Sequence, residues 1–394
     1  MKQGAPVRAR IIDDEGAFQA LLPEWWALLQ RAAHVEPTRT PVWLSAWWAV
    51  FGGTGGREMR VILAEDERGQ IVGIVPLVRR WTLREAVVPV PTLELMGSGE
   101  DQEDEICSEY LGPIAARGHE GTVARTLADV LCSARIDPWD ELRMPAMDAA
   151  DPMVHEVVGA LRDRAIDVQL HATHECPRVM LPATWEGYLA GLGAHRRYLV
   201  RRTLQDLEVW AGPGGAALRR ARDERELAEG WAVLQALHEG RWGGAGVFRS
   251  ERFRRFHEAV MPRLLRGEGG ELELLWLEVR GAPVAAIYTI VHDGDVQVYQ
   301  VGRELDVPKG VRPGVALHLL AIRRAIELGR RSYDFLGGAA LYKQQLALGE
   351  PRRLVTLSAV APTLRARTSS NVRRTARKLV SLAREIRDRA RLTS

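Results

Sequence analysis

Residues 312–316, Arg-Pro-Gly-Val-Ala, combine residue types that can bind an anion. Pro313 suits the first position of a helix, because the N–H that it lacks would have no partner there. The helix is indicated by apolar residues at helical spacing and by a glycine stop, namely Val315, Leu319, Ile322, Ile326 and Gly329. The unpaired N–H groups at its start would belong to Gly314, Val315 and Ala316, with Lys309 and Arg312 beside them. They suit a phosphate or pyrophosphate, although most helix starts of this kind bind only water.

Residues 332–343 are typical of a short buried strand, a tight turn and a second helix start. Tyr342, six residues after Leu336, can donate a proton or simply pack as an aromatic residue. Lys343 can neutralise a phosphate or lie in solvent. Asp334 stands between two aromatic residues, and a buried carboxylate needs a partner. It is therefore a base or half of an ion pair, with an arginine of residues 196–202 as its expected partner.

Two further segments carry candidate polar groups. Arg197 and Arg201 are four apart, so they share one helical face that suits a phosphate or carboxylate of a substrate. His238 precedes Arg241 and Trp242, and a histidine there can act as a base or cap the helix.

The order and spacing of these segments resemble the CelD-like (BioF2-like) acetyltransferases of the GNAT superfamily, whose architecture is similar to that of Fem-type aminoacyltransferases. The segments that carry the resemblance are 312–317, 334–338, Tyr342-Lys343, the tryptophan-rich residues 41–52, the arginine-rich residues 193–202, His238, Arg241-Trp242 and Phe248. They extend from about residue 40 to 345 and so cover most of the chain.

The resemblance implies an acyl-CoA donor. Strand 296–301 would supply an N–H to the thioester carbonyl, and the pantetheine arm would lie where this strand separates from residues 332–336. The implied catalytic residues are Tyr342, Asp334 and His238; the cofactor-binding residues are Lys309, Arg312, Gly314, Val315, Ala316 and Lys343; the substrate-binding residues are Arg197, Arg201 and Trp242. The superfamily loop begins with Gln or Arg, whereas Val311 stands at that position here. A charged tRNA therefore stays open as the carrier, and no metal is expected.

Length and composition favour an ordinary globular protein. A chain of 394 residues with 46% hydrophobic and 27% charged residues predicts two domains. No apolar run approaches the roughly 20 residues that span a bilayer, and the first residues lack the apolar stretch of a signal peptide. Cys107, Cys132 and Cys176 have no disulfide or metal spacing. We therefore expect a cytoplasmic protein.

The pattern of elements predicts a mixed α/β fold in which the two halves repeat one architecture. The resemblance implies that these are two tandem GNAT-like domains, each a mostly antiparallel sheet flanked by helices. Residues 1–170 and 171–362 form the expected domains, with a hairpin of residues 60–65 and 71–77 in the first and one helix over 185–210 in the second. The acidic residues 100–109 hold six carboxylates without EF-hand spacing, which favours a solvated loop. Trp43 and Trp47 are four apart and are expected in the N-terminal core.

The C-terminal residues 363–394 predict a basic amphipathic helix. They carry ten Lys and Arg against two Asp and Glu, so this segment has a charge of +8 and the rest of the chain −5. Val372, Leu379 and Ile386 form a narrow apolar stripe. Docking on the acidic body is the preferred interpretation, and peripheral contact with an anionic membrane or pairing in a dimer are the alternatives.

These features predict an N-acyltransferase that moves an acetyl or other acyl group from acyl-CoA to an amine, with polysaccharide or cell-envelope metabolism as a candidate setting. The acceptor, a small-molecule or glycan-precursor amine, would bind between the domains beside the arginine-rich helix. The alternatives are a Fem-like transferase that uses aminoacyl-tRNA and a catalytically degenerate GNAT scaffold in polysaccharide synthesis. No nucleic-acid partner is expected unless the donor is a tRNA.

Overall fold

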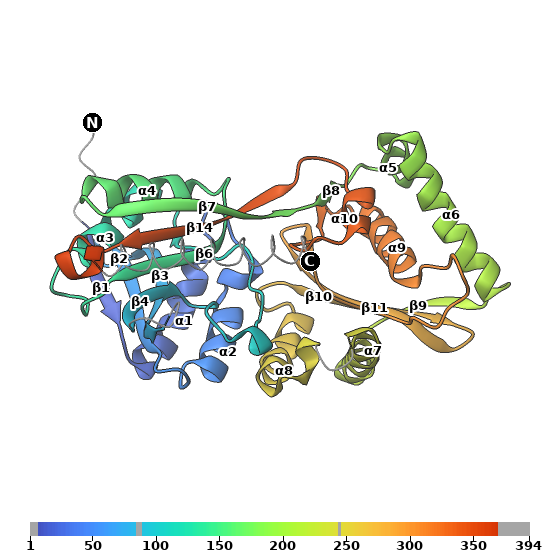
Figure 1. The fold of residues 1–394 in the computed structure, drawn as a ribbon, viewed down its shortest axis with the longest axis horizontal. Helices are drawn as coiled ribbons and strands as arrows, with labels where there is room; N and C mark the ends of the chain where they lie inside the picture. Colours follow the sequence, from blue (N-terminus) through green and yellow to red (C-terminus); the bar gives the residue numbers. More distant parts are fainter. Residues whose placement is uncertain (1–6, 84–88, 243–245, 369–394) are drawn as a thin grey trace, which may run out of the picture.

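The computed structural model describes residues 7–83, 89–242 and 246–368, except the side chains of residues 241 and 242. Two halves lie side by side along the longest axis, and each is built around a sheet (Figure 1). The expected mixed α/β class with two mostly antiparallel sheets is confirmed. The predicted basic tail helix lies outside the described residues from residue 369 onward.

The first sheet has the strand order β1-β2-β3-β4-β6-β14-β7, and β5 pairs with β3. Its strands are β1 (Arg8–Ile12), β2 (Glu58–Glu65), β3 (Ile71–Thr82), β4 (Val90–Leu95), β5 (Ile114–Ala115), β6 (Glu141–Asp148), β7 (Asp167–Cys176) and β14 (Arg352–Val360). The helices of this half are α1 (Glu15–Leu29), η1 (Pro37–Arg39), α2 (Pro41–Phe51), η2 (Gln102–Asp104), α3 (Glu120–Leu131) and α4 (Pro152–Asp163). Only β4 and β6 pair in parallel in this sheet, as far as the chain is described.

The second sheet has the order β8-β13-β12-β11-β10-β9, in which β12 and β13 pair in parallel. Its strands are β8 (Arg178–Met180), β9 (Ala216–Arg220), β10 (Glu271–Val279), β11 (Ala282–His292), β12 (Asp295–Arg303) and β13 (Ser332–Asp334). The helices are α5 (Trp185–Gly191), α6 (Ala194–Ala211), α7 (Glu224–Trp242), η4 (Val247–Arg249), α8 (Glu251–Leu265), α9 (Pro313–Glu327) and α10 (Leu341–Leu346). The single helix expected over residues 185–210 is wrong, because α5 ends at Gly191 and α6 starts anew after Gly193.

Local sequence signals set several element ends. The expected hairpin of β2 and β3 is confirmed, and Asp66 Oδ1 closes its turn by accepting from the N–H groups of Arg68 (2.9 Å) and Gln70 (2.8 Å). Thr40 caps α2 ahead of Pro41 at the first helical position. Ser250 caps α8 in the same way, accepting from the N–H of Phe253 at 2.9 Å.

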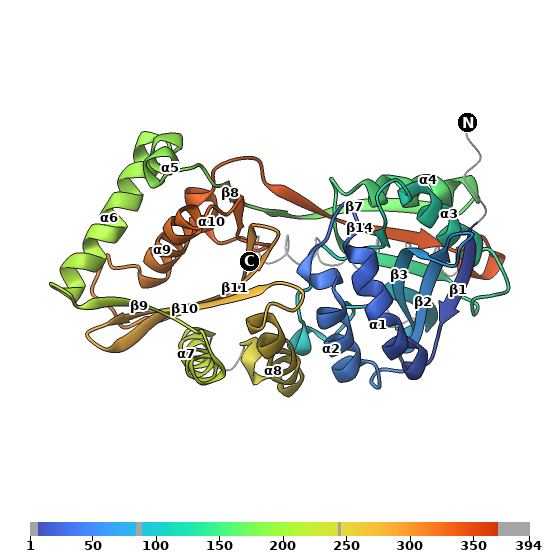
Figure 2. The ribbon, with the colours of Figure 1, turned by 180° about the vertical axis from the view of Figure 1, so that it is seen from behind.

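Two strands of the first sheet, β7 and β14, do not follow the predicted boundary between residues 170 and 171. β14 follows the whole second half in sequence, yet it returns to the first sheet and pairs with both β6 and β7 (Figures 1 and 2). β7 itself continues to Cys176. The division between the two sheets therefore differs from the predicted boundary at residues 170 and 171. That residues 1–170 and 171–362 fold as separate domains stays a prediction.

The hydrophobic core runs through the junction between the halves. One cluster joins the helices of the first half, including the buried Trp43 and Trp47, to α8 and to one face of the second sheet. Trp43 packs edge-on against Phe256 of α8, with ring centroids 4.8 Å apart. A separate cluster fills the other face of the second sheet, under α6 and α9. No helix in the described ranges is both long enough and apolar enough to cross a membrane.

Candidate active site

The parallel pair β12–β13 comes apart at its C-terminal end. Pairing covers only three residue pairs, from Asp295–Ser332 to Gln297–Asp334, whereas β12 continues to Arg303. From Val298 onward, β12 therefore has a strand partner only on its β11 side within the described chain. Its other edge offers free backbone groups to a ligand.

A β-bulge lies at the start of this free edge. The pairing register steps from Tyr288–Gln300 to Thr289–Val298, so Tyr299 has no partner residue on β11. A bulge bends its strand and leaves the backbone groups of the extra residue out of the ladder. The Tyr299 ring packs against Tyr288 of β11, with ring centroids 5.2 Å apart. Its hydroxyl donates to the Ile106 carbonyl and lies 3.1 Å from His257 Nε2.

A first cavity, which we call the β12–α9 cavity, has a volume of about 220 Å³. It is lined by Val301 and Arg303 of β12, by Arg312, Gly314, Val315 and His318 at the start of α9, and by Ala340 and Tyr342. Arg312 Nη2 is held by Thr203 Oγ1 of α6 at 2.7 Å. Three of the predicted cofactor-binding residues thus meet in one cavity, as does the predicted acid Tyr342.

The helix start of α9 differs in one detail from the expectation. The N–H of Ala316 donates to the Arg312 carbonyl at 3.0 Å and is therefore not free for an anion. The N–H groups of Gly314 and Val315 stand at the second and third helical positions, where an α-helix supplies no partner, and α9 has no side-chain cap. Lys309 is exposed in the preceding loop.

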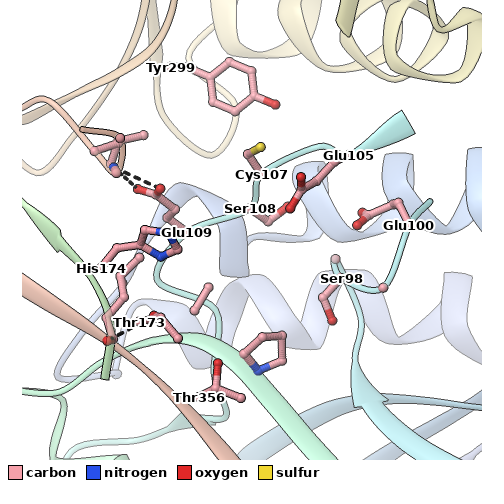
Figure 3. A pocket seen from close by; sticks show the side chains of 18 of the residues that line it. Ser98, Glu100, Glu105, Cys107, Ser108, Glu109, Thr173, His174, Tyr299 and Thr356 are labelled. Carbon is pink, nitrogen blue, oxygen red and sulfur yellow. Dashed lines mark hydrogen bonds between the residues drawn. The ribbon is translucent and has the colours of Figure 1, made fainter. Parts of the chain in front are cut away.

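A larger cavity lies between the two sheets, and we call it the intersheet cavity (Figure 3). Its volume is about 680 Å³. The walls come from β4 and β6, from the loop of residues 97–109, from Thr173 and His174 of β7, and from Val298–Gln300 and 335–338 of the second half. The expectation of a solvated acidic loop holds for Asp101, Glu103 and Glu105, which are exposed, whereas Glu100 and Glu109 are half-buried in the wall of the cavity.

Glu109 is the best-placed proton acceptor in the intersheet cavity. Both of its carboxylate oxygens accept from the N–H of Gly337, at 2.9 and 3.0 Å. A Cβ at Gly337 would lie 2.5 Å from Glu109 Oε1, so a larger residue there would displace the carboxylate. Burial, with the nearby Asp334 carboxylate adding to it, raises the pKa of Glu109 to about 7.

Glu100 stands on another part of the same wall, and burial raises its pKa to about 7 as well. It accepts a hydrogen bond from Trp47 Nε1. Sequence reasoning missed Glu100 and Glu109, because their burial comes from contacts distant in sequence: Gly337 is 228 residues from Glu109.

Lys343 and Tyr342 are neighbours in sequence but face different cavities. Lys343 Nζ lines the intersheet cavity and donates to the carbonyls of Phe335 (2.8 Å), Leu336 (3.3 Å) and Gly337. It braces the turn that presents Gly337 to Glu109, and burial lowers its pKa. Its predicted contact with a donor phosphate stays a prediction.

Asp334 is part of a buried network that joins the halves. It accepts from Tyr110 Oη (2.7 Å) and from the N–H of Leu336 (2.8 Å), and Arg352 Nη1 lies 3.8 Å away. The predicted partner among residues 196–202 is therefore wrong, since the arginine comes from β14. Burial raises the pKa of Asp334 to about 6.

Three further candidates, His238, Arg197 and Arg201, line neither of the two cavities. His238 of α7 packs edge-on against Phe248 at 4.7 Å between ring centroids and lines neither cavity. Arg197 Nη2 donates to the Leu192 carbonyl at 3.0 Å, and Arg201 is exposed. The side chain of Trp242 lies outside the described residues.

The helix α6 lies at the outer side of the second half and contributes no residue to the intersheet cavity (Figures 1 and 2), but its Arg196 lines a neighbouring cavity together with Thr173 and His174 of β7. The acceptor cleft predicted beside this helix stays a prediction. Within the described ranges, no group of three or more His, Cys, Asp or Glu residues is arranged to hold a metal ion.

Comparison with known proteins agrees with this geometry. Residues 194–344 match the model of the acetyltransferase (GNAT) domain. The fold is similar to FemX (TM-score 0.56, 10% identity, 89% of this chain and 96% of that chain). It is also similar to a protein of unknown function from Bacteroides thetaiotaomicron (TM-score 0.51, 10% identity, 90% of this chain and 100% of that chain). No curated protein matches the sequence.

A third solved structure with this fold is the C-terminal domain of a candidate lysylphosphatidylglycerol synthetase from Agrobacterium fabrum (TM-score 0.50, 10% identity, 86% of this chain and 92% of that chain). At such identities the likeness concerns the fold alone. The domain match assigns residues 194–344 to the acetyltransferase (GNAT) domain, and the fold of the chain has Fem-like architecture. The protein is accordingly an acyltransferase.

Proposed function

We propose that the protein is an N-acyltransferase that moves an acetyl or other acyl group from acyl-CoA to an amine held in the intersheet cavity. The observation that carries this proposal is the free edge of β12. Val298–Gln300 face the intersheet cavity, while Val301 and Arg303 face the β12–α9 cavity. A thioester lying along this edge would therefore reach an acceptor on one side while its carrier stays on the other.

The donor end is supported by the start of α9. The N–H groups of Gly314 and Val315, the helix dipole and the side chain of Arg312 together suit a pyrophosphate. The pantetheine arm would follow the free edge of β12, whose backbone N–H groups can stabilise the negative charge that develops on the thioester oxygen. Lys309, exposed nearby, would add a positive charge at the entrance.

The acceptor end is supported by Glu109. An amine is protonated at neutral pH and must lose protons to form the amide, so a base with a pKa near 7 is well matched to it. The ammonium group first releases one proton to solvent, and the neutral amine nitrogen then attacks the thioester carbon. Glu109 takes the second proton from this nitrogen directly or through one water. The carbon–sulfur bond then breaks, and Tyr342 gives its hydroxyl proton to the leaving thiolate.

The carboxylates of Glu100, Glu105 and Glu109 can pair with a cationic acceptor in the intersheet cavity, which Arg143 and Lys343 also line. That charge is consistent with an amine-bearing small molecule or glycan precursor. A cytoplasmic location, where acyl-CoA is available, is part of the same proposal.

The fold similarity to FemX favours a second candidate, a Fem-like transferase that uses aminoacyl-tRNA. Calorimetry against CoA, acetyl-CoA and longer acyl-CoAs tests the first proposal. We expect saturable binding of CoA, and transfer of radiolabelled acetyl from acetyl-CoA to an amine. Absence of CoA binding together with transfer from aminoacyl-tRNA would establish the alternative, and absence of both activities would favour a non-catalytic scaffold.

A further inference from the structure

His318 of α9 is a buried polar residue that the proposed chemistry does not use. Its side chain lines the β12–α9 cavity and is only 1% exposed. The Nδ1 atom lies 2.9 Å from Tyr333 Oη, whereas Nε2 is buried without a hydrogen-bond partner among the described residues. A buried polar atom without a partner is unfavourable, so its retention at a cavity wall points to a ligand.

The proton of His318 can be placed from its surroundings. Burial, with the charge of Lys343 adding to it, lowers the pKa of His318 to about 3, so the ring is neutral at physiological pH. Tyr333 is fully buried, and its hydroxyl forms a hydrogen bond with His318. A phenol donates to a neutral imidazole nitrogen more strongly than it accepts from one. Nδ1 is then the acceptor, and the proton sits on Nε2, facing the cavity.

The position of His318 along α9 defines which part of a donor it would meet. It is four residues after Gly314, so it lies on the same helical face, roughly 6 Å further along the helix axis. In a ligand whose pyrophosphate binds at Gly314, the chain attached to the phosphates would lie beside His318. In CoA that chain is the pantetheine arm, which is slender and carries two amide carbonyls.

We propose that His318 Nε2–H donates a hydrogen bond to an amide carbonyl of the pantetheine arm, which makes His318 a residue that selects CoA-type donors. The inference rests on the proposed function and identifies its carrier. The walls beside His318, Val301, Val315 and Ala340, are small or aliphatic and suit a narrow chain. The ring of Tyr342, 4.9 Å from the His318 ring, lies along the same path toward the thioester.

The test compares CoA with 3′-phosphoadenosine 5′-diphosphate, which is CoA without its pantetheine arm. We expect His318→Leu to weaken CoA binding about tenfold in calorimetry, as for the loss of one buried hydrogen bond, and to leave the armless nucleotide unchanged. His318→Gln, whose amide N–H can occupy the place of Nε2–H, should retain most of the affinity for CoA.

A second measurement uses the wild-type protein and so does not depend on how the variants fold. In ¹⁵N-histidine NMR spectra, His318 should show the Nε2–H tautomer, and its Nε2 signal should shift with CoA and stay in place with the armless nucleotide. Equal loss of both ligands in His318→Leu, unchanged CoA affinity, or the Nδ1–H tautomer would overturn the role of His318. A wild-type protein that binds neither ligand would instead overturn the proposed function, and the inference with it.

Discussion

The two halves of the molecule contain the same structural unit, and only one of them keeps room for a donor. In each, a parallel strand pair interrupts an antiparallel sheet, and a helix connects the two strands: α3 between β4 and β6, and α9 between β12 and β13. α3 packs directly on its sheet, so that a Cβ on Gly73 would lie 2.1 Å from Val123 Cγ2. α9 instead borders the β12–α9 cavity.

The helix starts differ in charge as well as in space. α3 carries Glu120 in its first turn, where a carboxylate already occupies the positive end of the helix dipole. α9 begins with Arg312, Pro313 and Gly314 and has no acidic residue in its first turn. In the proposed function, the start of α9 in the second half provides the anion site, while the loop of residues 97–109 in the first half contributes the carboxylates that line the acceptor side.

The largest expected effect tests the α9 start. Gly314→Asp places a carboxylate at the N–H groups proposed to hold the pyrophosphate, where it would crowd and repel the ligand. We expect no measurable CoA binding by calorimetry, with an unchanged melting temperature. Gly193→Asp is the matched control, because it adds the same charge in open space at the start of α6. Wild-type CoA affinity in Gly314→Asp would remove α9 as the donor site.

The next effect concerns the acid on the cavity wall. Tyr342→Phe keeps the ring beside His318 and removes the proton for the leaving thiolate. The turnover number should fall by roughly 10²–10⁴-fold with little change in KM. Steady-state kinetics with the wild-type acceptor measures it. Turnover close to wild type would show that Tyr342 only packs.

Arg352 tests how much the ion pairs of β14 contribute to the stability of the protein, since β14 follows the second half in sequence but pairs in the first sheet. Its guanidinium lies 2.5 Å from Glu36, 2.7 Å from Asp148 and over the Tyr110 ring at 3.5 Å. Arg352→Met would leave buried carboxylates unpaired and should lower the free energy of unfolding by about 3–5 kcal/mol in urea titrations. The neighbouring Arg353 is 67% exposed, so Arg353→Met should change it by less than about 1 kcal/mol.

Glu109 sharpens the assignment of the acceptor side. Glu109→Gln should lower kcat/KM by roughly 10²-fold. In the wild type, kcat/KM should rise with pH through about 7, where Glu109 loses its proton, and this limb should vanish in the variant. A pH profile unchanged by the substitution would assign the base elsewhere, with Glu100 as the next candidate.

The same substitution has a predicted sign for stability. The folded pKa of about 7 is above the ordinary value of 4.5, so burial of Glu109 favours its protonated form. That contribution is fully present below pH 4.5 and is lost as the pH rises through about 7. Glu109→Gln should therefore melt at a higher temperature than the wild type at pH 8 and differ less at pH 5.

Much of the second half could be predicted from sequence, because its signals are local. Helical spacing after Pro313 predicted α9, and the pattern of residues 332–343 predicted β13, the turn after it and the start of α10. The helix α8 and the strand β14 were not predicted. β14 pairs with β6 and β7, about 200 residues earlier in the chain, and no local pattern encodes that choice.

The same contrast between local and long-range signals applies to the residues of the candidate site. Gly314, Val315 and Tyr342 were found because a helix start and a short spacing mark them. Glu109 was missed, since its raised pKa comes from burial and from the nearby Asp334 carboxylate, and both depend on the tertiary fold. Arg197 and Arg201 were chosen for a helical face that packs outside the cavity. Their guanidinium groups could bind an anion, but the sequence alone does not show which face of the helix lines a cavity.

The smallest expected effect is that of Glu120→Gln, which tests whether the start of α3 in the first half can bind a second donor. If the α3 start excludes anions only through the charge of Glu120, then Glu120→Gln should create a second site. We expect it not to, because α3 is packed against β3 with no cavity comparable to that beside α9. Calorimetry should give one CoA per chain for wild type and variant, with affinities within about twofold of each other. A second CoA equivalent in Glu120→Gln would show that charge alone distinguishes the halves.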